Sequence, residues 1–551
     1  MHRILHRFVL FDEVIPVFTD YFSGFCVLRL LWSQINQQHM KKYILLIACI
    51  WYTGAFAQNT KIDNYFNSLG DQLNGNILLA QNGRVVLSRA SGYADYLTKK
   101  PNTTDARFNL CSISKVFTST AILQLRDKGK LSLDDRLSKY FPDFQFPDIT
   151  LRQLLAHTSG LPDFAIWEDR VGKDSSVVLT TNRDLLPAIQ AWKGGLRFKP
   201  GTQYQYCNVG YQLLALVIEK VTGASLSAYL DRYIFKPSGM NDTYLSVYPD
   251  RIWQHDPRAV RMHKQNHPYY DTTYTYTDSS SIFEYVRYQN YNCGALIGGS
   301  NVMSTTSDLM AFDRAFFSGK LLKPSSVAEA LEPLKINGIV VYDRQMDTMV
   351  GEGKMTVGLG WDIWEQPGYG KSVGHGGYLF GNATIYIHHM LGNQTIIAFD
   401  NDEHTEFGRI VTSSLYLLNG KEPLEIRHHR SMAFVYGSTL VKEGPDAAAV
   451  AFNAIKSDTV HYYLSEWEFN QLGGNLINLS KFEGHGQLAL EAFKLNTIMF
   501  PNSANTYDSY AYGLRAMGRK KEAIQMYQKS LAMEPNNDDG KQALKELMEG
   551  K

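Results

Sequence analysis

Two β-hairpin signals bracket a stretch of about 330 residues in this chain. In the first, the apolar runs Asn76–Ala80 and Val85–Ser88 are joined by a Gln-Asn-Gly-Arg turn. Asn-Gly between two such runs strongly predicts a hairpin. In the second, Thr384–Ile387 and Thr395–Phe399 flank a Leu-Gly-Asn turn. Strands at both ends of one region predict a sheet that combines them.

The segments between the hairpins have helical patterns. Ser112 to roughly Lys128 carries apolar residues at helical spacing, and Gly210–Val221 predicts a second helix that ends at Gly223. Helices enclosed between terminal strands are typical of an α+β domain. We therefore expect an antiparallel sheet built from both ends of this region, flanked by helices.

Length and charge limit the alternatives. The chain has 551 residues, which is enough for a large core and an additional module. It is 44% hydrophobic and 20% charged, with a net charge of +1 and no basic block. This balance gives no indication of nucleic-acid binding.

The N-terminal region has the pattern of an export signal. Lysines follow Met40, an apolar run covers Tyr43–Phe56, and the Ala-Phe-Ala sequence ending at Ala57 fits a cleavage site. We interpret residues 40–57 as a signal peptide and residues 1–39 as an extension from a mis-assigned start. An uncleaved anchor and a lipid-modified Cys49 are the alternatives. The expected location is exported, periplasmic or secreted, without a stable membrane span after cleavage.

Three short motifs follow one another in a suggestive order. They are Ser112-Ile113-Ser114-Lys115, Tyr206-Cys207-Asn208 and His375-Gly376-Gly377. A serine hydroxyl is a weak nucleophile at neutral pH and needs a base beside it. Residues three apart on a helix share a face, so a lysine at position 115 can reach the hydroxyl at position 112.

The combination resembles the serine β-lactamase, DD-peptidase and esterase superfamily, especially its class C-like branch. The resemblance covers about residues 60–415 and rests on these stretches: Arg107–Lys115, Leu154–Leu161, Tyr206–Tyr211, Ser304–Leu309, Gly358–Trp361 and Gly374–Gly377. It implies a β-lactamase/transpeptidase-like fold, in which helices flank an antiparallel sheet and form an all-helical subdomain.

The resemblance also implies roles for individual residues. Ser112 corresponds to the acylated nucleophile, Lys115 to the proton-relaying lysine and Tyr206 to the general base. Asn208, His375 and Gly377 correspond to substrate-binding positions, and the backbone N–H of Tyr378 would join that of Ser112 in the oxyanion hole. A neutral Lys115 acting as the base itself is the alternative.

The third motif departs from the Lys-Thr-Gly of class C β-lactamases. Histidine at position 375 has a reference pKa near 6.5 and is mostly neutral at pH 7. Efficient β-lactam hydrolysis is therefore in question, whereas acyl transfer is not. His157 lies in a segment that is structural in the family. We expect no cofactor and no metal, because His388-His389 and His428-His429 lack spaced partners.

Three cysteines would remain after signal cleavage, namely Cys111, Cys207 and Cys293. An odd number cannot form a complete disulfide framework, and we interpret Cys111 and Cys207 as small buried packing residues. The Tyr-rich stretch from Trp253 to Tyr291 has no clear periodicity. This pattern is typical of a long loop, and we interpret it as a candidate lid.

The C-terminal part repeats with a period of 34 residues. The matching pairs are Gly484 and Gly518, Ala489 and Ala523, Phe493 and Tyr527, and Pro501 and Pro535. This period is typical of tetratricopeptide repeats, with units at about 470–503 and 504–537 and an earlier helical pair at roughly 428–465.

We therefore expect a hydrolase domain at 58–420 and a helical repeat module at 421–551. The predicted activity is that of an exported serine hydrolase acting on D-amino-acid peptides, esters or β-lactams. The alternative is a catalytically weak ligand sensor or scaffold that binds a protein partner through the repeats.

Overall fold

The computed structural model describes residues 60–549, apart from residues 71, 96–97, 164, 167–180, 248–255, 262, 265–273, 276–295, 343–352, 367, 380, 403–405, 427–429, 479–482 and 536. The predicted extension and signal peptide, with Cys49, lie outside the described residues. So do Cys293, the pair at 428–429 and most of the Tyr-rich excursion.

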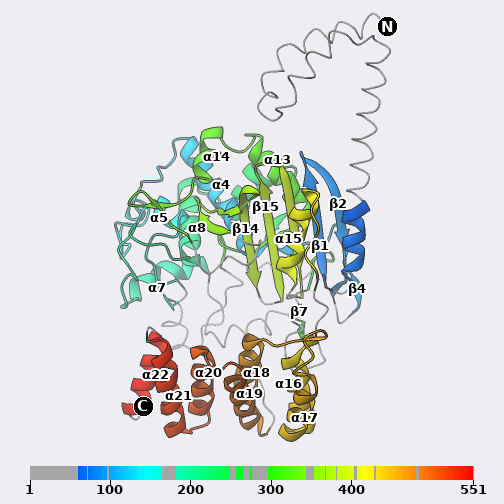
Figure 1. Cartoon of the computed structure of the whole chain (residues 1–551). Helices are drawn as coiled ribbons and strands as arrows, with labels where there is room; N and C mark the ends of the chain where they lie inside the picture. Colours follow the sequence, from blue (N-terminus) through cyan, green and yellow to red (C-terminus); the bar gives the residue numbers. More distant parts are fainter. Residues whose placement is uncertain are drawn as a thin grey trace, which may run out of the picture. The chain divides into compact units, whose positions relative to one another are not determined.

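The part of the chain before residue 420 is called the front domain. A seven-stranded antiparallel sheet forms its centre, with the strand order β12-β13-β14-β15-β16-β1-β2 (Figure 1). The strands are β1 Gly75–Gln81, β2 Arg84–Ala90, β12 Lys354–Val357, β13 Asp362–Gln366, β14 Gly370–Leu379, β15 Asn382–His389 and β16 Gln394–Asp400. β1 pairs with β16 along its whole length, from Gly75 opposite Asp400 to Gln81 opposite Gln394. The predicted sheet, which combines strands from both ends of this region, is confirmed.

Both predicted hairpins are present. β1 and β2 are joined at Asn82 and Gly83, whose φ angles of 51° and 71° are the left-handed values that a two-residue hairpin turn needs. β15 and β16 pair from Ala383 opposite Asp400 to His389 opposite Gln394. The strands exceed the predicted runs because polar residues at their ends also join the ladder.

Helices cover both faces of the sheet, and every residue of β15 and β16 is buried. α13 (Thr306–Phe317) packs on one face, where Phe312 contacts the ring of Tyr386 on β15. α15 (Phe407–Leu418) also packs on β16, and its last turn accepts a hydrogen bond from Gln394 through the carbonyl of Leu418. Because its faces are covered, the sheet is a rigid support for residues on β14.

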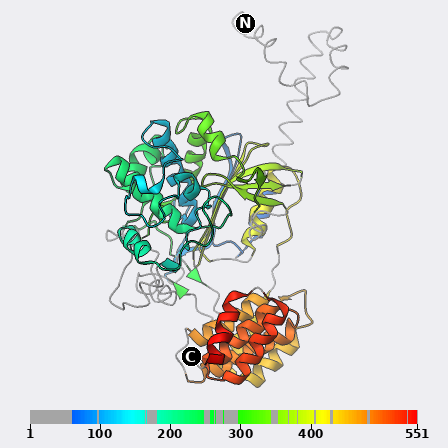
Figure 2. The same cartoon turned by 90° about the vertical axis from the view of Figure 1, so that its left-hand side faces the viewer.

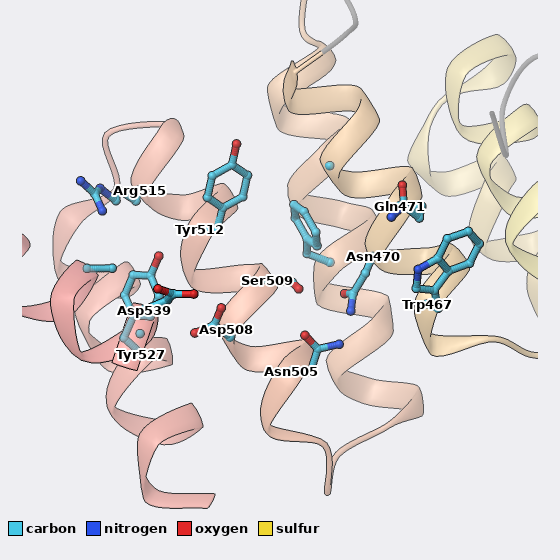
Figure 3. Close-up of a pocket in the computed structure, with 14 residues that line it drawn as sticks. Trp467, Asn470, Gln471, Asn505, Asp508, Ser509, Tyr512, Arg515, Tyr527 and Asp539 are labelled. Carbon is cyan, nitrogen blue, oxygen red and sulfur yellow. The ribbon is translucent and has the colours of Figure 1, made fainter. Parts of the chain in front are cut away.

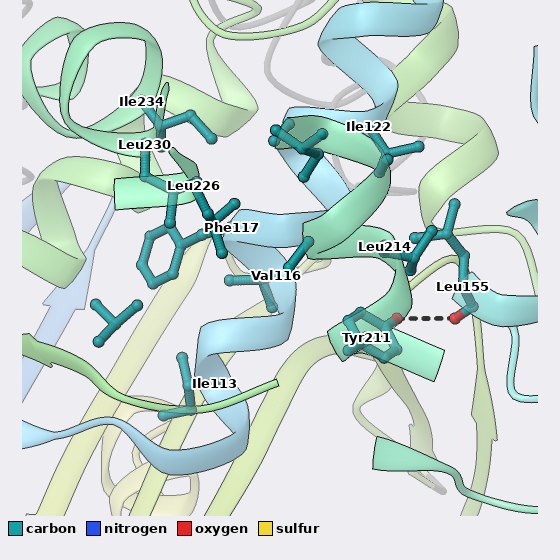
Figure 4. Close-up of a cluster of buried hydrophobic side chains, with 14 of the residues drawn as sticks. Ile113, Val116, Phe117, Ile122, Leu155, Tyr211, Leu214, Leu226, Leu230 and Ile234 are labelled. Carbon is teal, nitrogen blue, oxygen red and sulfur yellow. Dashed lines mark hydrogen bonds between the residues drawn. The ribbon is translucent and has the colours of Figure 1, made fainter. Parts of the chain in front are cut away.

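Two helices carry the first two motifs. η3 (Cys111–Ile113) is one turn of 3-10 helix that runs into α4 (Ser114–Asp127), and α8 spans Asn208–Thr222. The predicted helices are confirmed, with Ser112 in the 3-10 turn and Gly223 ending α8 at a φ of 67°. Figure 4 shows α4 and α8 in the main apolar core, where the Tyr211 hydroxyl donates to the carbonyl of Leu155.

The remaining short elements complete the front domain. They are β3 Tyr93–Asp95, β4 Lys100–Pro101, β5 Phe108–Asn109, η4 Leu137–Lys139, α5 Leu151–Leu155, η5 Asn182–Asp184, α7 Leu185–Ala191, α9 Leu226–Leu230, η6 Asp231–Phe235, α10 Lys236–Ser238, β6 Tyr244–Leu245, β7 His263–Lys264, β8 Tyr274–Thr275, β9 Val302–Ser304, α14 Pro324–Ala330, β10 Lys335–Ile336 and β11 Ile339–Val340.

The C-terminal part is almost entirely helical (Figure 2). Its elements are β17 Arg430–Ser431, α16 Met432–Glu443, α17 Pro445–Ile455, β18 Tyr462–Tyr463, α18 Glu466–Asn478, α19 His485–Met499, α20 Ala504–Ala516, α21 Lys520–Met533 and α22 Asp538–Glu549. Two apolar clusters hold them together, and both consist only of residues after position 431. The helical region predicted from the sequence is therefore present, with its own core.

Within the described ranges, no single helix is both long and apolar enough to cross a membrane. α8 and the helical stretch Leu226–Ser238 pass such a test only when they are joined across a bend of 76°.

Candidate active site

Ser112 lies in a turn whose backbone is held in an uncommon conformation. Cys111, directly before it, has a φ of 50°, which is rare for a residue with a side chain. Two amide groups hold this turn: the Cys111 N–H donates to Asn109 Oδ1 at 2.9 Å, and Asn382 Nδ2 donates to Cys111 Sγ at 3.1 Å. These bonds place Ser112 directly before α4. Burial raises the pKa of the Cys111 thiol to about 12.

Lys115 is completely buried and points at the serine. Its Nζ lies 2.9 Å from Ser112 Oγ, 2.9 Å from Asn208 Oδ1 and 3.0 Å from the carbonyl oxygen of Gly299. Burial lowers the pKa of this lysine to about 7, although nearby carboxylates oppose the shift. A large fraction of the molecules therefore has a neutral amine at neutral pH, which can accept the serine proton.

Tyr206 is the second titratable residue beside the serine. Its hydroxyl forms a hydrogen bond with Ser112, and Lys115 Nζ lies 4.9 Å from the centre of its ring. Burial raises the pKa of this tyrosine well above 10. The sequence left Lys115 and Tyr206 open as the base, and these two pKa directions favour a neutral lysine and a protonated tyrosine.

His157 packs against Tyr206. The two rings stack with centres 4.3 Å apart and planes 25° apart. His157 Nδ1 accepts a hydrogen bond from the Cys207 N–H at 3.0 Å, and burial keeps its pKa well below 6.5. The histidine is a neutral support for the tyrosine ring, in line with its predicted structural role.

Asp163 is a component of the site that the motifs did not indicate. One carboxylate oxygen accepts the N–H groups of Asn208 at 2.8 Å and Val209 at 3.1 Å, and the other accepts Asn208 Nδ2 at 3.3 Å. The carboxylate thus caps the start of α8, whose own N-cap residue Cys207 offers no side-chain bond. Asp163 has a φ of 52°, and no sequence pattern indicated its part in the site.

β14 brings the third motif to the serine. Its first half, 370–374, pairs with β13, whereas 372–379 pairs with β15. Within the described ranges, one edge of β14 has no paired strand beyond Gly374, and the strand contacts η3 there. A Cβ at Gly377 would lie 2.5 Å from the Leu110 carbonyl oxygen and 3.0 Å from Cys111 Cβ, so only glycine permits this approach.

His375 is buried beside a carboxylate. Its Nδ1 lies 2.5 Å from the carbonyl oxygen of Gly376 and 3.5 Å from Asp362 Oδ2. Asp362 also accepts the Gly376 N–H at 3.1 Å and so fixes this part of β14. Burial lowers the pKa of His375 despite that carboxylate, so the ring is neutral at pH 7.

The structure thus brings together Ser112, Lys115, Tyr206, Asn208, His375 and Gly377, which lie far apart in the sequence. Tyr378 follows on the same strand edge, with a side chain that is 51% exposed. The sequence did not single out Asp163, Asp362 or the carbonyl of Gly299. Among the described residues, no group of three or more potential ligands is arranged to hold a metal ion.

The sequence of residues 62–413 matches the Beta-lactamase family. The chain belongs to this family. Penicillin-binding protein 4* of Bacillus subtilis is 31% identical over 366 residues, which cover 65% of this chain and 76% of that protein. A D-aminopeptidase of Cereibacter sphaeroides is 39% identical over 170 residues, which cover 30% of this chain and 32% of that protein. The enzyme class of this β-lactamase-related chain is serine hydrolase.

Solved structures agree on the fold. The octameric penicillin-binding protein homologue from Pyrococcus abyssi superposes with a TM-score of 0.54 at 21% identity, covering 66% of this chain and 78% of that one. A penicillin-binding protein from Bacillus halodurans gives 0.51 at 24% identity, covering 64% of this chain and 96% of that one. At these identities the likeness shows the α+β fold alone.

Proposed function

We propose that the front domain hydrolyses amide or ester bonds through an acyl-enzyme on Ser112. The observation that carries this proposal is the buried Lys115 Nζ, 2.9 Å from the serine hydroxyl. As Ser112 Oγ bonds to the substrate carbonyl carbon, neutral Lys115 takes the hydroxyl proton. The proton then passes through the Tyr206 hydroxyl to the leaving nitrogen or oxygen, and the bond to that atom breaks.

The same groups can complete the cycle. A water molecule replaces the leaving group, gives its proton to Lys115 and attacks the ester carbonyl, and Ser112 recovers its hydroxyl. The N–H groups of Ser112 and Tyr378 are our candidates for the oxyanion hole. Asn208 is held by Asp163 and Lys115, so we assign it a role in positioning the base and the substrate.

Three substrate classes remain for this chemistry: D-amino-acid peptides, esters and β-lactams. The D-aminopeptidase among the relatives supports the first class, and the penicillin-binding relative supports the third. A neutral His375 cannot offer a substrate carboxylate the permanent charge of a lysine. We therefore rank neutral esters and D-amino-acid amides that carry no carboxylate above β-lactams.

Covalent labelling tests the proposal. A fluorophosphonate and a fluorescent penicillin should label the protein at Ser112, and Ser112→Ala should prevent labelling and reduce turnover by several orders of magnitude. Turnover of a D-Ala-D-Ala peptide, a small ester and a β-lactam then ranks the substrates. A folded protein that is never labelled and turns over none of the three would favour the ligand sensor or scaffold.

We further infer that residues 421–551 form a tetratricopeptide-like module. Residues 34 positions apart have the same structural role there: Gly484 and Gly518 have φ angles of 83° and 73°, and Ala489 and Ala523 are fully buried. Phe493 and Tyr527 are buried as well. Limited proteolysis that releases one stable fragment beginning near position 421 would support this boundary and that of the hydrolase domain at 58–420.

Export is also a proposal, and it rests on the sequence pattern of residues 40–57. N-terminal sequencing of the protein from its native location tests it. A mature chain that begins at Gln58 supports cleavage, whereas an intact or lipid-modified N-terminus supports one of the two alternatives.

A further inference from the structure

The C-terminal helices form a groove of about 520 Å³. Three alternate helices, α18, α20 and α22, provide most of its lining, and Figure 3 shows their side chains facing the same space. Two aromatic side chains in this lining remain accessible, because Trp467 is 48% exposed and Tyr512 is 36% exposed. The groove is a site separate from Ser112, with walls that are partly aromatic and partly polar.

The repeat spacing places polar groups in a row along this groove. Gln471, Asn505 and Asp539 are each 34 positions apart, and all three line it. Gln471 is partly exposed and Asp539 is exposed, so both side chains are accessible. Asn505 donates to Glu466 at 2.8 Å, which leaves its carbonyl oxygen available. A side-chain amide offers one donor and one acceptor group, as a peptide unit does, so this row suits an extended backbone.

One end of the row is negatively charged. Asp508 and Asp539 both line the groove, and only Arg515 provides a positive charge in that lining. Arg515 is already paired with Glu546 at 2.8 Å. Burial, and then the charges of Asp539 and Glu534, raise the pKa of Asp508. A bound cation would reduce this repulsion, and the ring of Tyr512 on the same helix can also receive it.

We propose that this groove binds an extended peptide segment with a basic side chain. The row of Gln471 and Asn505 holds the backbone, and the lysine or arginine of the ligand enters between Asp508 and Asp539. This inference concerns a second site and does not depend on the hydrolase activity.

Peptides that differ in one side chain test the proposal on the full chain. The probes are peptides (Gly-Ser-X-Gly)₃-amide that carry fluorescein on the N-terminal amine, in which X is lysine, norleucine or glutamate. Fluorescence polarisation should give a dissociation constant for the lysine peptide at least about tenfold lower than for the other two. Asp508→Asn combined with Asp539→Asn should raise the lysine value to the norleucine value, because asparagine keeps the acceptor for Asn537 but removes the charge.

Matched variants separate this site from general attraction to acidic surfaces. Asp446→Asn, at an exposed position of α17 outside the groove, should leave binding unchanged. Gln471→Ala should weaken the lysine and norleucine peptides by similar factors, because it removes a backbone contact. Circular dichroism should confirm that each variant folds. The proposal is overturned if lysine gives no advantage over norleucine, if Asp446→Asn weakens binding as much as the groove variants, or if no peptide saturates the protein by about 1 mM.

Discussion

At the residue scale, both the oxygen and the nitrogen of the Asn208 side-chain amide have hydrogen-bond partners. Its Oδ1 accepts a hydrogen bond from Lys115 and its Nδ2 donates one to Asp163. One side chain therefore links the buried lysine to the buried carboxylate. Asp163 also contributes a negative charge that favours the protonated lysine. Its carboxylate therefore acts on both the position and the basicity of Lys115.

We expect Asp163→Asn to move the acid limb of the kcat/KM profile to lower pH. Loss of the negative charge favours neutral Lys115, while asparagine keeps one oxygen acceptor for the start of α8. Measurement of kcat/KM against pH on a neutral ester checks this. The charges facing Lys115 also include Asp362, and Asp362→Asn is the matched comparison. A uniform loss of activity without a shift of the limb would mean that Asp163 acts on structure alone.

Lys115 itself should determine the pH dependence of acylation. The neutral amine is the reactive form, so kcat/KM should rise with pH through an apparent pKa of about 7. Lys115→Arg should lose activity across the whole range, because a guanidinium stays protonated. Stopped-flow labelling by a fluorophosphonate at a series of pH values gives this profile. A rate that falls as pH rises would exclude the neutral lysine as base.

Tyr206→Phe should slow acylation by about 10²–10⁴-fold, because it interrupts proton transfer to the leaving group. Tyr65→Phe is the control within another Tyr-x-Asn triplet, since Tyr65 is buried near Ser413 and Arg409 of α15. The third triplet, at Tyr288, lies outside the described residues. Comparable damage from Tyr65→Phe and Tyr206→Phe would remove the support for a proton relay.

His375 should discriminate between charged and neutral substrates only in acid solution. Burial lowers its pKa, so the ratio of kcat/KM for a carboxylate substrate to that for a neutral ester should be flat above about pH 6.5. The ratio should rise only below that value, where the ring gains a proton. Taking a ratio cancels the titration of Lys115.

His375→Lys is the matched variant. A permanent charge should raise the ratio at pH 7–8 and favour β-lactams relative to esters. A ratio that does not change with pH in the wild-type enzyme, and does not respond to this variant, would leave His375 as a wall of the site only.

At the element scale, local patterns predicted the pieces of this domain and could not predict how they meet. The two hairpins and the helices from Ser112 and Gly210 depend on turn residues and apolar spacing within a few positions. The contact of Lys115 with Gly299 spans 184 positions, and that of Asp163 with Asn208 spans 45. No short-range pattern encodes such contacts, and only the resemblance to a family indicated that the three motifs converge.

The approach of β14 to η3 gives a test at this scale. Gly377→Ala should push the strand away from Ser112, because the new methyl would lie 2.5 Å from the Leu110 carbonyl oxygen. We expect labelling of Ser112 to slow at least about tenfold, with a loss of about 1–3 kcal/mol in unfolding free energy. Gly474→Ala is the control, since a Cβ there meets nothing within 4 Å. If Ser112 is labelled at the normal rate in Gly377→Ala, the site does not require the close approach of β14 to η3.

At the scale of the whole molecule, the main apolar core and the two C-terminal clusters draw on different parts of the chain. The main core ends with Phe399, and the C-terminal clusters begin at Met432. Deletion after position 425 should therefore leave a front domain that folds and is labelled at Ser112. This cut keeps the Glu425 carbonyl that accepts from Arg409 at 2.8 Å. A truncated chain that folds, by circular dichroism, but is not labelled would show that the repeats help to build the site.

The pairing of β1 with β16 also determines the order of events during synthesis. The ribosome makes the first hairpin early, but that hairpin gains its neighbour only when residues 394–400 emerge. Isolated two-stranded hairpins have only marginal stability in water. The edge of β1 therefore stays unpaired until β16 has been synthesised. Each C-terminal helix, by contrast, meets its partner within a few tens of residues and can dock soon after it is made. A chain that stops before Gln394 therefore contains Ser112, Lys115 and Tyr206 but lacks the β16 strand that completes the sheet.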